Sequence, residues 1–99
     1  MAASAEVAFF KISAHIEKQG GAHSDWYCGI ASNIEGQLFF GHSVSRENDL
    51  WVDSECESSG TARAVRKALL ELGCDGGVDK GDEDSIYVYA YLKSSSTVP

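Results

Sequence analysis

The sequence predicts a single α+β domain, in which a small and mainly antiparallel β-sheet carries two helices in the order β-β-α-β-α-β. Its length of 99 residues, 43% of them hydrophobic, suits one packed core. Tyrosines alternate with aliphatic residues over 86–92, as they do in strands. Strong helix formers fill 62–72 and are followed by Gly73, which is typical of a helix end. We therefore expect residues 1–99 to form one domain, with 94–99 as a flexible tail.

The first two strands are expected to pair as a hairpin near the N-terminus. Residues 6–16 are rich in apolar and aromatic side chains with polar interruptions, which favours a first strand. Gly20 and Gly21 end this segment. The short apolar run 26–30 predicts a second, buried strand, joined to the first by the loop 19–24.

Helices and strands alternate in the rest of the chain. Asn33 is placed to cap a short helix that ends near Gly41. Acids alternate with apolar residues over 49–57, which predicts a half-exposed strand. Gly and Asp are frequent over 74–85, which predicts a solvated loop, and its acids lack the spacing of an EF-hand. For the helix 62–72, the candidate caps are Ser58, Ser59 and Thr61, and the expected buried stripe is Ala62, Val65, Leu69 and Leu72.

The chain is acidic, with 15 Asp and Glu residues against 8 Lys and Arg and a formal net charge of -7. Direct nucleic-acid binding is not expected, because phosphates attract basic surfaces and repel acidic ones. No apolar run approaches the roughly 20 residues that a membrane helix needs, and the N-terminus does not resemble a secretion signal. The three cysteines form neither a paired framework nor a metal-binding spacing. These features predict a cytoplasmic protein with reduced thiols and no membrane association.

The segment 26–33 (WYCGIASN), followed by Leu38 and His42, places a Tyr-x-Gly triplet on the second expected strand, just before the expected short helix. These residues resemble the second half of the GIY-YIG nuclease signature and the helix after it, with YCG in the place of YIG. Residues 10–12 (FKI) are similar to the GIY strand, and 62–70 to the helix that carries the family's catalytic glutamate. The likeness covers 9–91 and implies a GIY-YIG-like fold.

The resemblance also implies a nuclease site whose chemistry is lost. In the family, tyrosines orient a water, an arginine stabilises charge on the phosphate, and a glutamate holds a metal ion. The arginine position holds the neutral Gln37, and the glutamate position holds Arg66, whose charge repels a cation. We therefore expect an inactive protein that uses no metal and no cofactor. The implied vestigial site comprises Phe10, Tyr27, Gly29, Gln37, His42 and Arg66.

Other interpretations of the same residues stay open at this point. The first is a diverged, metal-dependent endonuclease with relocated groups, for which the candidates are Glu35, Glu71, Asp75, Arg63 and Lys67. The second is a module that binds nucleic acid through its basic residues, which are Lys11, Arg63, Arg66 and Lys67. A third interpretation is purely structural, with Tyr27 as a sheet aromatic and His42 as a helix-end residue.

The acids predict an inhibitory role toward another protein. Carboxylates that imitate phosphates let a small acidic protein compete with nucleic acid for a basic groove. A phage protein that blocks a host defence nuclease, such as an anti-CRISPR protein, fits this description and would act in the host cytoplasm. The expected partner is a nucleic-acid-binding protein or nuclease complex, and the alternative is that the acids only solvate the surface. The expected contacts are Glu47, Asp49, Asp53, Glu55 and Glu57 along one edge, and Asp79, Asp82, Glu83 and Asp84 on the loop.

Overall fold

The sheet and helices follow the α+β class that the sequence predicts. The computed structural model describes residues 2–19, 22–42, 44, 50–76, 84–94 and 97. The elements of this part of the chain are, in order, helix α1 (Ala5–Lys18), 3-10 helix η1 (His23–Asp25), strand β1 (Trp26–Ala31), π-helix η2 (Glu35–Gly41), strand β2 (Trp51–Glu55), helix α2 (Ser59–Glu71) and strand β3 (Tyr87–Leu92). The prediction of a small antiparallel sheet with helices packed on it is confirmed.

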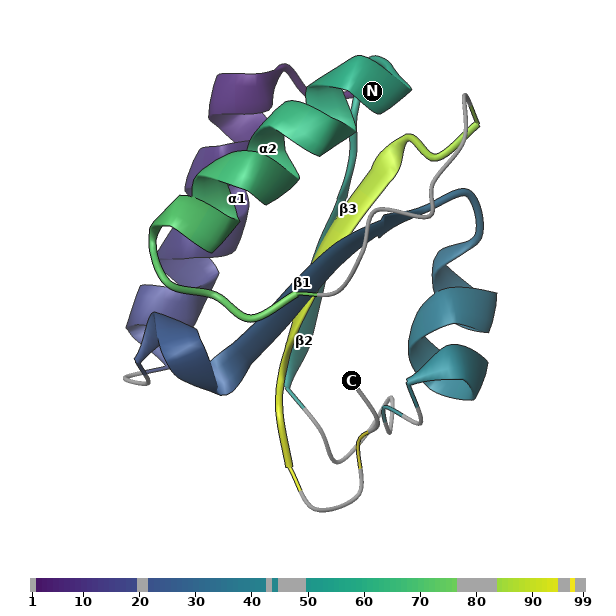
Figure 1. The fold of residues 1–99 in the computed structure, drawn as a ribbon. Coiled ribbons are helices and arrows are strands. Elements are labelled where there is room, and N and C mark those ends of the chain that lie inside the picture. The colour runs from purple at the N-terminus through teal and green to yellow at the C-terminus, as the bar shows by residue number, and fades with distance from the viewer. Residues whose placement is uncertain are drawn as a thin grey trace.

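Strand β3 is the centre of the sheet, whose strand order is β1-β3-β2. It pairs antiparallel with β1 on one side and with β2 on the other (Figure 1). The predicted hairpin between the first two segments is wrong, because β1 pairs with the last strand. Short parallel bridges join Tyr27 of β1 to Asp75, and Ala3 to Cys56 just beyond β2. These bridges cover part of the outer edges that the two flanking strands present.

The first segment is helix α1, so the predicted strand over 6–16 is wrong. Ala8, Ile12 and Ile16 are completely buried, and their four-residue spacing places them on one face of a helix. Phe10, which a strand would bury on the same face as Ile12, is 73% exposed. The aromatic residues of this segment therefore suggest a strand, while its buried residues follow a helical period.

Helix α2 and its ends follow the sequence prediction. Ser58 is the N-cap, since its hydroxyl accepts a hydrogen bond from the amide of Thr61 at 3.1 Å. Gly73 follows the helix with a φ of +112°, a left-handed conformation that favours glycine. Leu72 is 46% exposed and does not belong to the buried stripe, because it lies at the C-cap, beyond the last helical turn. The other three predicted members of the stripe are buried.

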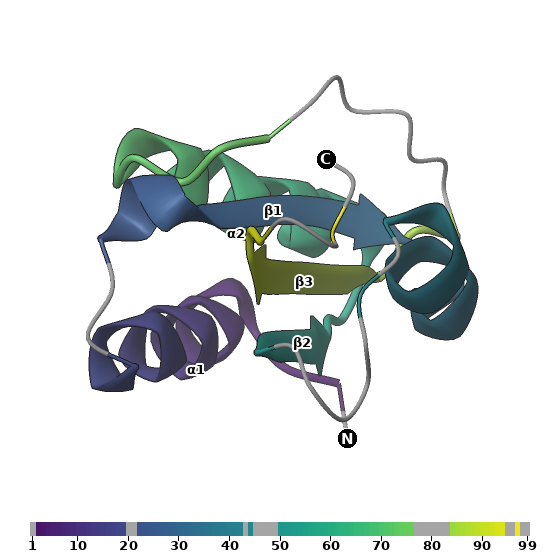
Figure 2. The same ribbon diagram turned by 90° about the horizontal axis from the view of Figure 1, so that it is seen from below.

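The sheet is buried on both faces. Helices α1 and α2 cover one face, and η2 lies on the side of the sheet opposite to them (Figure 1, Figure 2). The core on the helical side includes the sheet and loop residues Trp26, Cys28, Ile30, Val52, Cys56, Cys74, Val88 and Ala90. The core on the η2 side consists of Ala31, Leu38, Val44, Tyr89 and Tyr91, with Tyr27, Ile34, Phe39 and Trp51 packed against it. The alternation along β3 thus places its tyrosines on the η2 side.

The remaining predicted segments have mixed outcomes. The strands predicted over 26–30, 49–57 and 86–92 are confirmed as β1, the shorter β2 and β3, and Asp49 lies outside the described residues. The predicted short helix is η2, which ends at Gly41 as expected. Residues 77–83 of the predicted loop lie outside the described residues. In the predicted tail, Thr97 is buried and its hydroxyl donates to the carbonyl of Ser94 (3.1 Å).

Within the described residues, no helix is both long and apolar enough to cross a membrane.

Two substitutions on α1 distinguish the helix from the predicted strand. Ile12→Ala removes a completely buried side chain, so we expect the free energy of unfolding to fall by about 2–5 kcal/mol. Phe10→Ala, two residues away, is expected to cost less than about 0.5 kcal/mol, because Phe10 lies on the exposed face. Urea unfolding followed by circular dichroism measures both losses. Comparable losses for the two variants would favour the strand, in which both side chains share one face.

Candidate functional site

The sheet face beneath η2 is a grid of aromatic and acidic side chains. The antiparallel register places rows of directly opposed residues on this face, because side chains alternate along each strand. The rows are Tyr27, Tyr91 and Trp51; Gly29, Tyr89 and Asp53; and Ala31, Tyr87 and Glu55. Aromatic side chains therefore fill one end of the face, and the carboxylates of β2 lie toward the other end.

His42 lies against the aromatic end of this face and is 7% exposed. The end of η2 positions it, since the amide of His42 donates to the carbonyl of Gln37 (3.0 Å) with the five-residue spacing of a π-helix. Its Nε2 atom lies 2.9 Å from the hydroxyl of Tyr89, and its Nδ1 atom lies 3.2 Å from the hydroxyl of Tyr91. Its ring also packs on Tyr27, with ring centroids 5.0 Å apart. Both ring nitrogens are therefore bonded to tyrosines of β3.

Gln37 indicates which nitrogen of His42 carries the proton. The amide nitrogen of Gln37 lies 3.3 Å from Nε2 of His42, and an amide nitrogen can only donate. With its proton on Nδ1, His42 donates to the hydroxyl of Tyr91 and accepts at Nε2. Because Nε2 has one lone pair, the amide of Gln37 and the hydroxyl of Tyr89 share it in a three-centre hydrogen bond. We name these four residues, with Tyr27, the tyrosine–histidine cluster.

Tyr89 and Tyr91 stay protonated. Burial raises the pKa of both Tyr89 and Tyr91, and the neighbouring Tyr27 adds to the rise. A hydrogen bond with Gln37 opposes the rise at Tyr89. A protonated phenol donates a hydrogen bond but is a weak nucleophile. The cluster therefore offers a fixed set of neutral hydrogen bonds rather than a reactive phenolate.

Gly29 allows Tyr89 to reach His42. A Cβ atom at Gly29 would lie 2.7 Å from Cζ of Tyr89 and closer still to its hydroxyl, well inside van der Waals contact. The ring of Tyr89 therefore crosses β1 directly over the glycine, and a side chain at this position would displace the ring. The glycine of the YCG triplet thus has a structural role that does not depend on catalysis.

The structure divides the implied vestigial site into two groups. The residues that meet at the cluster are Tyr27, Gly29, Gln37 and His42. Phe10 lies on α1, in the layer on the opposite side of the sheet, because residues 6–16 form a helix instead of the expected strand. Arg66 lies on α2 in that same layer, although its charge still opposes the rise that burial produces in the pKa of Tyr89.

Tyr89 and Tyr91 are missing from the sequence-based site. A signal for them is present in the sequence, since tyrosines at every second position of a strand share one face, as Tyr27 and Gly29 do. The missing information is that β1 pairs with β3, which places these residues opposite one another.

The described acids of the expected partner surface gather at the other end of the sheet. On and just after β2 they are Asp53, Glu55 and Glu57. The amide of Cys56 donates to the carbonyl of Ile86 (2.7 Å), and the amide of Ile86 donates to the carbonyl of Asp84 (2.9 Å). The loop acid Asp84 therefore lies at the same end, and we call these four acids the acidic edge. The expected contacts outside the described residues are Glu47, Asp49, Asp79, Asp82 and Glu83.

The negative charge of the acidic edge acts on Tyr87 of β3. Its hydroxyl donates to Oε1 of Glu55 at 3.2 Å. This hydrogen bond and the charge of Glu55 raise the pKa of Tyr87, and the charge of Asp53 acts in the same direction. The carboxylates of β2 therefore act together on a neighbouring strand.

Of the alternative metal ligands whose side chains the structure describes, Asp75 lies beside Tyr27, through the parallel bridge. Its carboxylate accepts hydrogen bonds from Nζ of Lys93 (3.1 Å) and from the amide of Gly76 (2.9 Å), which hold the pKa of Asp75 below its usual range. Glu71 is exposed on α2, and the side chain of Glu35 lies outside the described part of the chain. Among the described residues, His, Cys, Asp and Glu side chains form no group of three suited to a metal ion.

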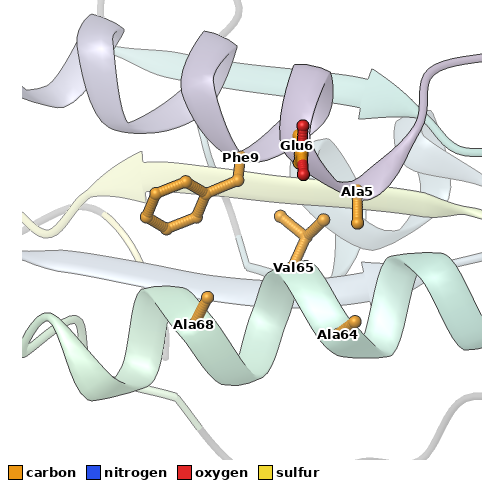
Figure 3. Close-up of a pocket in the computed structure, with 6 residues that line it drawn as sticks. All are labelled: Ala5, Glu6, Phe9, Ala64, Val65 and Ala68. Carbon is orange, nitrogen blue, oxygen red and sulfur yellow. The ribbon is translucent and has the colours of Figure 1, made fainter.

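A hollow lies between α1 and α2, in the layer on the opposite side of the sheet from the cluster (Figure 3). It has a volume of about 210 Å³, and its lining residues are Ala5, Glu6, Phe9, Ala64, Val65 and Ala68. Figure 3 shows Phe9 and Val65 between the two helices. Apart from the carboxylate of Glu6 this lining is apolar and holds no nucleophile, so it does not compete with the cluster as a reactive site.

Comparison with protein-family models, curated proteins and solved structures gives no match to this chain. The function is therefore inferred from the residues of the chain itself.

Gly29→Ala tests the contact that organises the cluster. We expect it to lower the free energy of unfolding by about 1–3 kcal/mol, because the new methyl group overlaps the ring of Tyr89. The matched control is Gly60→Ala in α2, where the new Cβ meets only the Ser58 hydroxyl at 3.7 Å, so stability should stay the same or rise. Urea unfolding measures the free energy, and near-ultraviolet circular dichroism reports the tyrosines. Equal stabilities of the two variants would contradict the contact.

Proposed function

We propose that the protein binds another protein through its acidic edge, blocks a groove of that partner that normally holds nucleic acid, and cleaves no nucleic acid itself. In this proposal the chain is a GIY-YIG-like pseudo-nuclease, an inhibitor whose fold has been kept while the family's chemistry has been lost. A phage counter-defence role against a host nuclease complex, like that of an anti-CRISPR protein, fits such a surface. The protein would then act in the host cytoplasm.

The observation that carries the proposal is the meeting of two acidic segments at one end of the sheet. Pairing of β2 with β3 brings Asp84 to the end where Glu55 and Glu57 lie. Helices α1 and α2 contain five of the eight Lys and Arg residues but three of the fifteen acids. The two helices therefore carry more basic than acidic residues, whereas the four acids of the acidic edge lie outside them, as suits a phosphate mimic.

The spacing of the acids also suits a phosphate mimic. Asp53 and Glu55 are alternate residues of one strand face, so their Cα atoms lie about 7 Å apart. Alternate phosphates of one DNA strand rise by about 7 Å along the helix axis. Two carboxylates of β2 therefore present negative charge at an interval of the same order as the spacing of charge along one DNA strand.

The chemistry of the tyrosine–histidine cluster supports an absence of cleavage. Phosphodiester hydrolysis needs a group that balances the charge developing on the phosphate. Gln37, at the family's arginine position, is neutral and is bonded to His42. Arg66, at the family's glutamate position, carries a positive charge and lies on the other side of the sheet. The cluster thus supplies neutral hydrogen bonds where the reaction needs a cation and a metal ligand.

Charge reversal on the acidic edge tests the binding proposal. The full chain is immobilised and exposed to a bacterial lysate, and the retained nucleic-acid-binding protein is eluted with duplex DNA. We expect Glu55→Lys/Glu57→Lys to reduce retention at least tenfold, because each change replaces an attraction by a repulsion. Glu17→Lys/Glu71→Lys, which makes the same change of net charge on exposed positions of the helical layer, should retain the partner. Equal retention by both variants, or a retained protein that duplex DNA does not release, would contradict the proposal.

A diverged metal-dependent endonuclease is the second candidate, because Asp75 lies beside Tyr27. In this role the carboxylate of Asp75 would exchange its hydrogen bond with Lys93 for a metal ion, and Tyr27 would face the attacking water. The exposed position of Asp75 leaves it accessible to an ion. The same ion pair with Lys93 opposes metal binding, which is why we rank this candidate second.

A nuclease assay decides between the two candidates. The full chain is incubated with single- and double-stranded DNA and RNA in the presence of magnesium or manganese. We expect no cleavage above that of Asp75→Asn, because Gln37 supplies no cation to the phosphate and Arg66 cannot hold a metal ion. Metal-dependent cleavage by the native chain that is lost in both Asp75→Asn and Tyr27→Phe would establish the endonuclease instead.

A further inference from the structure

Two of the three cysteines form a pair that neither the cluster nor the acidic edge uses. Cys28 lies on β1 and Cys74 follows α2, and both are free thiols buried on the helical side of the sheet, 0% and 5% exposed. Their thiols are hydrogen-bonded to each other. The third cysteine, Cys56, is also buried, but its thiol donates to the carbonyl of Ser54 at 3.9 Å.

The backbone holds the two cysteines of this pair on neighbouring segments. Asp75 pairs with Tyr27 in a parallel bridge between the two cysteines. The amide of Cys28 donates to the carbonyl of Asp75 (2.9 Å), and the amide of Asp75 donates to the carbonyl of Trp26 (2.8 Å). Cys74 therefore lies beside β1 as an added edge residue. In this register Cys74 is opposite Trp26, so Cys74 and Cys28 lie diagonally across the bridge, and both belong to the core on the helical side of the sheet. A disulfide needs Cα atoms within about 7 Å of each other, so closure would draw Cys74 along β1 toward Cys28.

The two thiols differ in their readiness to react. The hydrogen bond from the thiol of Cys28 lowers the pKa of Cys74, and the same bond together with burial raises the pKa of Cys28. Cys74 also lies between Gly73 and Asp75, which are both exposed, whereas Cys28 lies within the sheet. Local opening of the chain after α2 would thus present Cys74 first.

We propose that Cys28 and Cys74 are a redox-active pair that closes into an intramolecular disulfide when the protein meets a low-molecular-weight disulfide. The thiolate of Cys74 attacks one sulfur of the small disulfide, which gives a mixed disulfide and releases one small thiolate. Cys28 loses its proton and attacks Sγ of Cys74, which displaces the second small thiolate. The protein dithiol is oxidised by two electrons, the small disulfide is reduced by them, and the two thiol protons pass to the two released thiolates.

The cross-link would join the segment after α2 to the outer edge of β1. Cys28 is the middle residue of the triplet that contains Tyr27 and Gly29, so the bond would fix the strand on which the tyrosine–histidine cluster is built. A disulfide between residues far apart in the chain also restricts the unfolded state. Oxidation is therefore expected to make β1 more rigid and the folded chain more heat-stable.

The test uses the reduced full-length protein and oxidised glutathione as the probe. After acid quenching and alkylation, mass spectrometry should find two thiols lost and a cross-linked peptide that joins Cys28 to Cys74. The matched control Cys56→Ala should give the same cross-link, since Cys56 is an equally buried thiol outside the pair. Cys28→Ala should instead keep glutathione attached to Cys74. Native protein that retains all its thiols, or that forms a cross-link through Cys56, would overturn the proposal.

Hydrogen exchange gives a second readout that needs no variant. Oxidation of the native chain should slow exchange of the amides of Cys28 and Asp75 at least tenfold, because opening of the edge would now require a covalent bond to break. The amide of Cys56, which bonds to Ile86 at the far end of β2, serves as the internal reference. Unchanged exchange at Cys28 and Asp75 after cross-linking would show that the bond does not act on β1.

Discussion

The close contact between the ring of Tyr89 and the backbone of Gly29 is the constraint on which the η2 side of the sheet depends. Because β1 has no side chain at this point, the ring lies flat enough for its hydroxyl to meet Nε2 of His42. His42 in turn binds Tyr91 and contacts Tyr27, which joins the end of η2 to two strands. A buried imidazole with both nitrogens bonded is stable only where every partner is in place. One missing Cβ atom thus permits the whole cluster.

The pairing of β3 with β1 and β2 separates two surfaces with different properties. Toward one end of β3, Tyr89 and Tyr91 enclose a neutral hydrogen-bond network, and toward the other end Tyr87 meets the carboxylate of Glu55. Neutral, enclosed groups stabilise the fold and do little for phosphate chemistry, while exposed carboxylates attract a basic partner over a distance. An inhibitor needs this combination of a rigid support and a charged edge, and our proposed function assigns one role to each end.

Sequence patterns predicted the elements whose signals are local. Helix α2 was predictable because Ser58 caps it and Gly73 ends it, and β3 because its tyrosines alternate with aliphatic residues. Helix α1 was not predicted, because its aromatic residues are typical of a strand. Its buried residues Ala8, Ile12 and Ile16 nevertheless follow the period of a helix. In the site, Tyr27, Gly29, Gln37 and His42 were grouped through a motif. Tyr89, Tyr91 and the pairing of Cys28 with Cys74 depend on contacts between distant segments, which no local pattern encodes.

The hydrogen-bonded state of His42 tests the account of the cluster most directly, and nitrogen NMR of the folded protein measures it. We expect a proton on Nδ1 that exchanges slowly with water and shows a nuclear Overhauser contact to the ring of Tyr91, together with an unprotonated Nε2. A ring that exchanges between both tautomers, with no protected N–H, would contradict the account, because His42 would then not be held between Tyr89 and Tyr91.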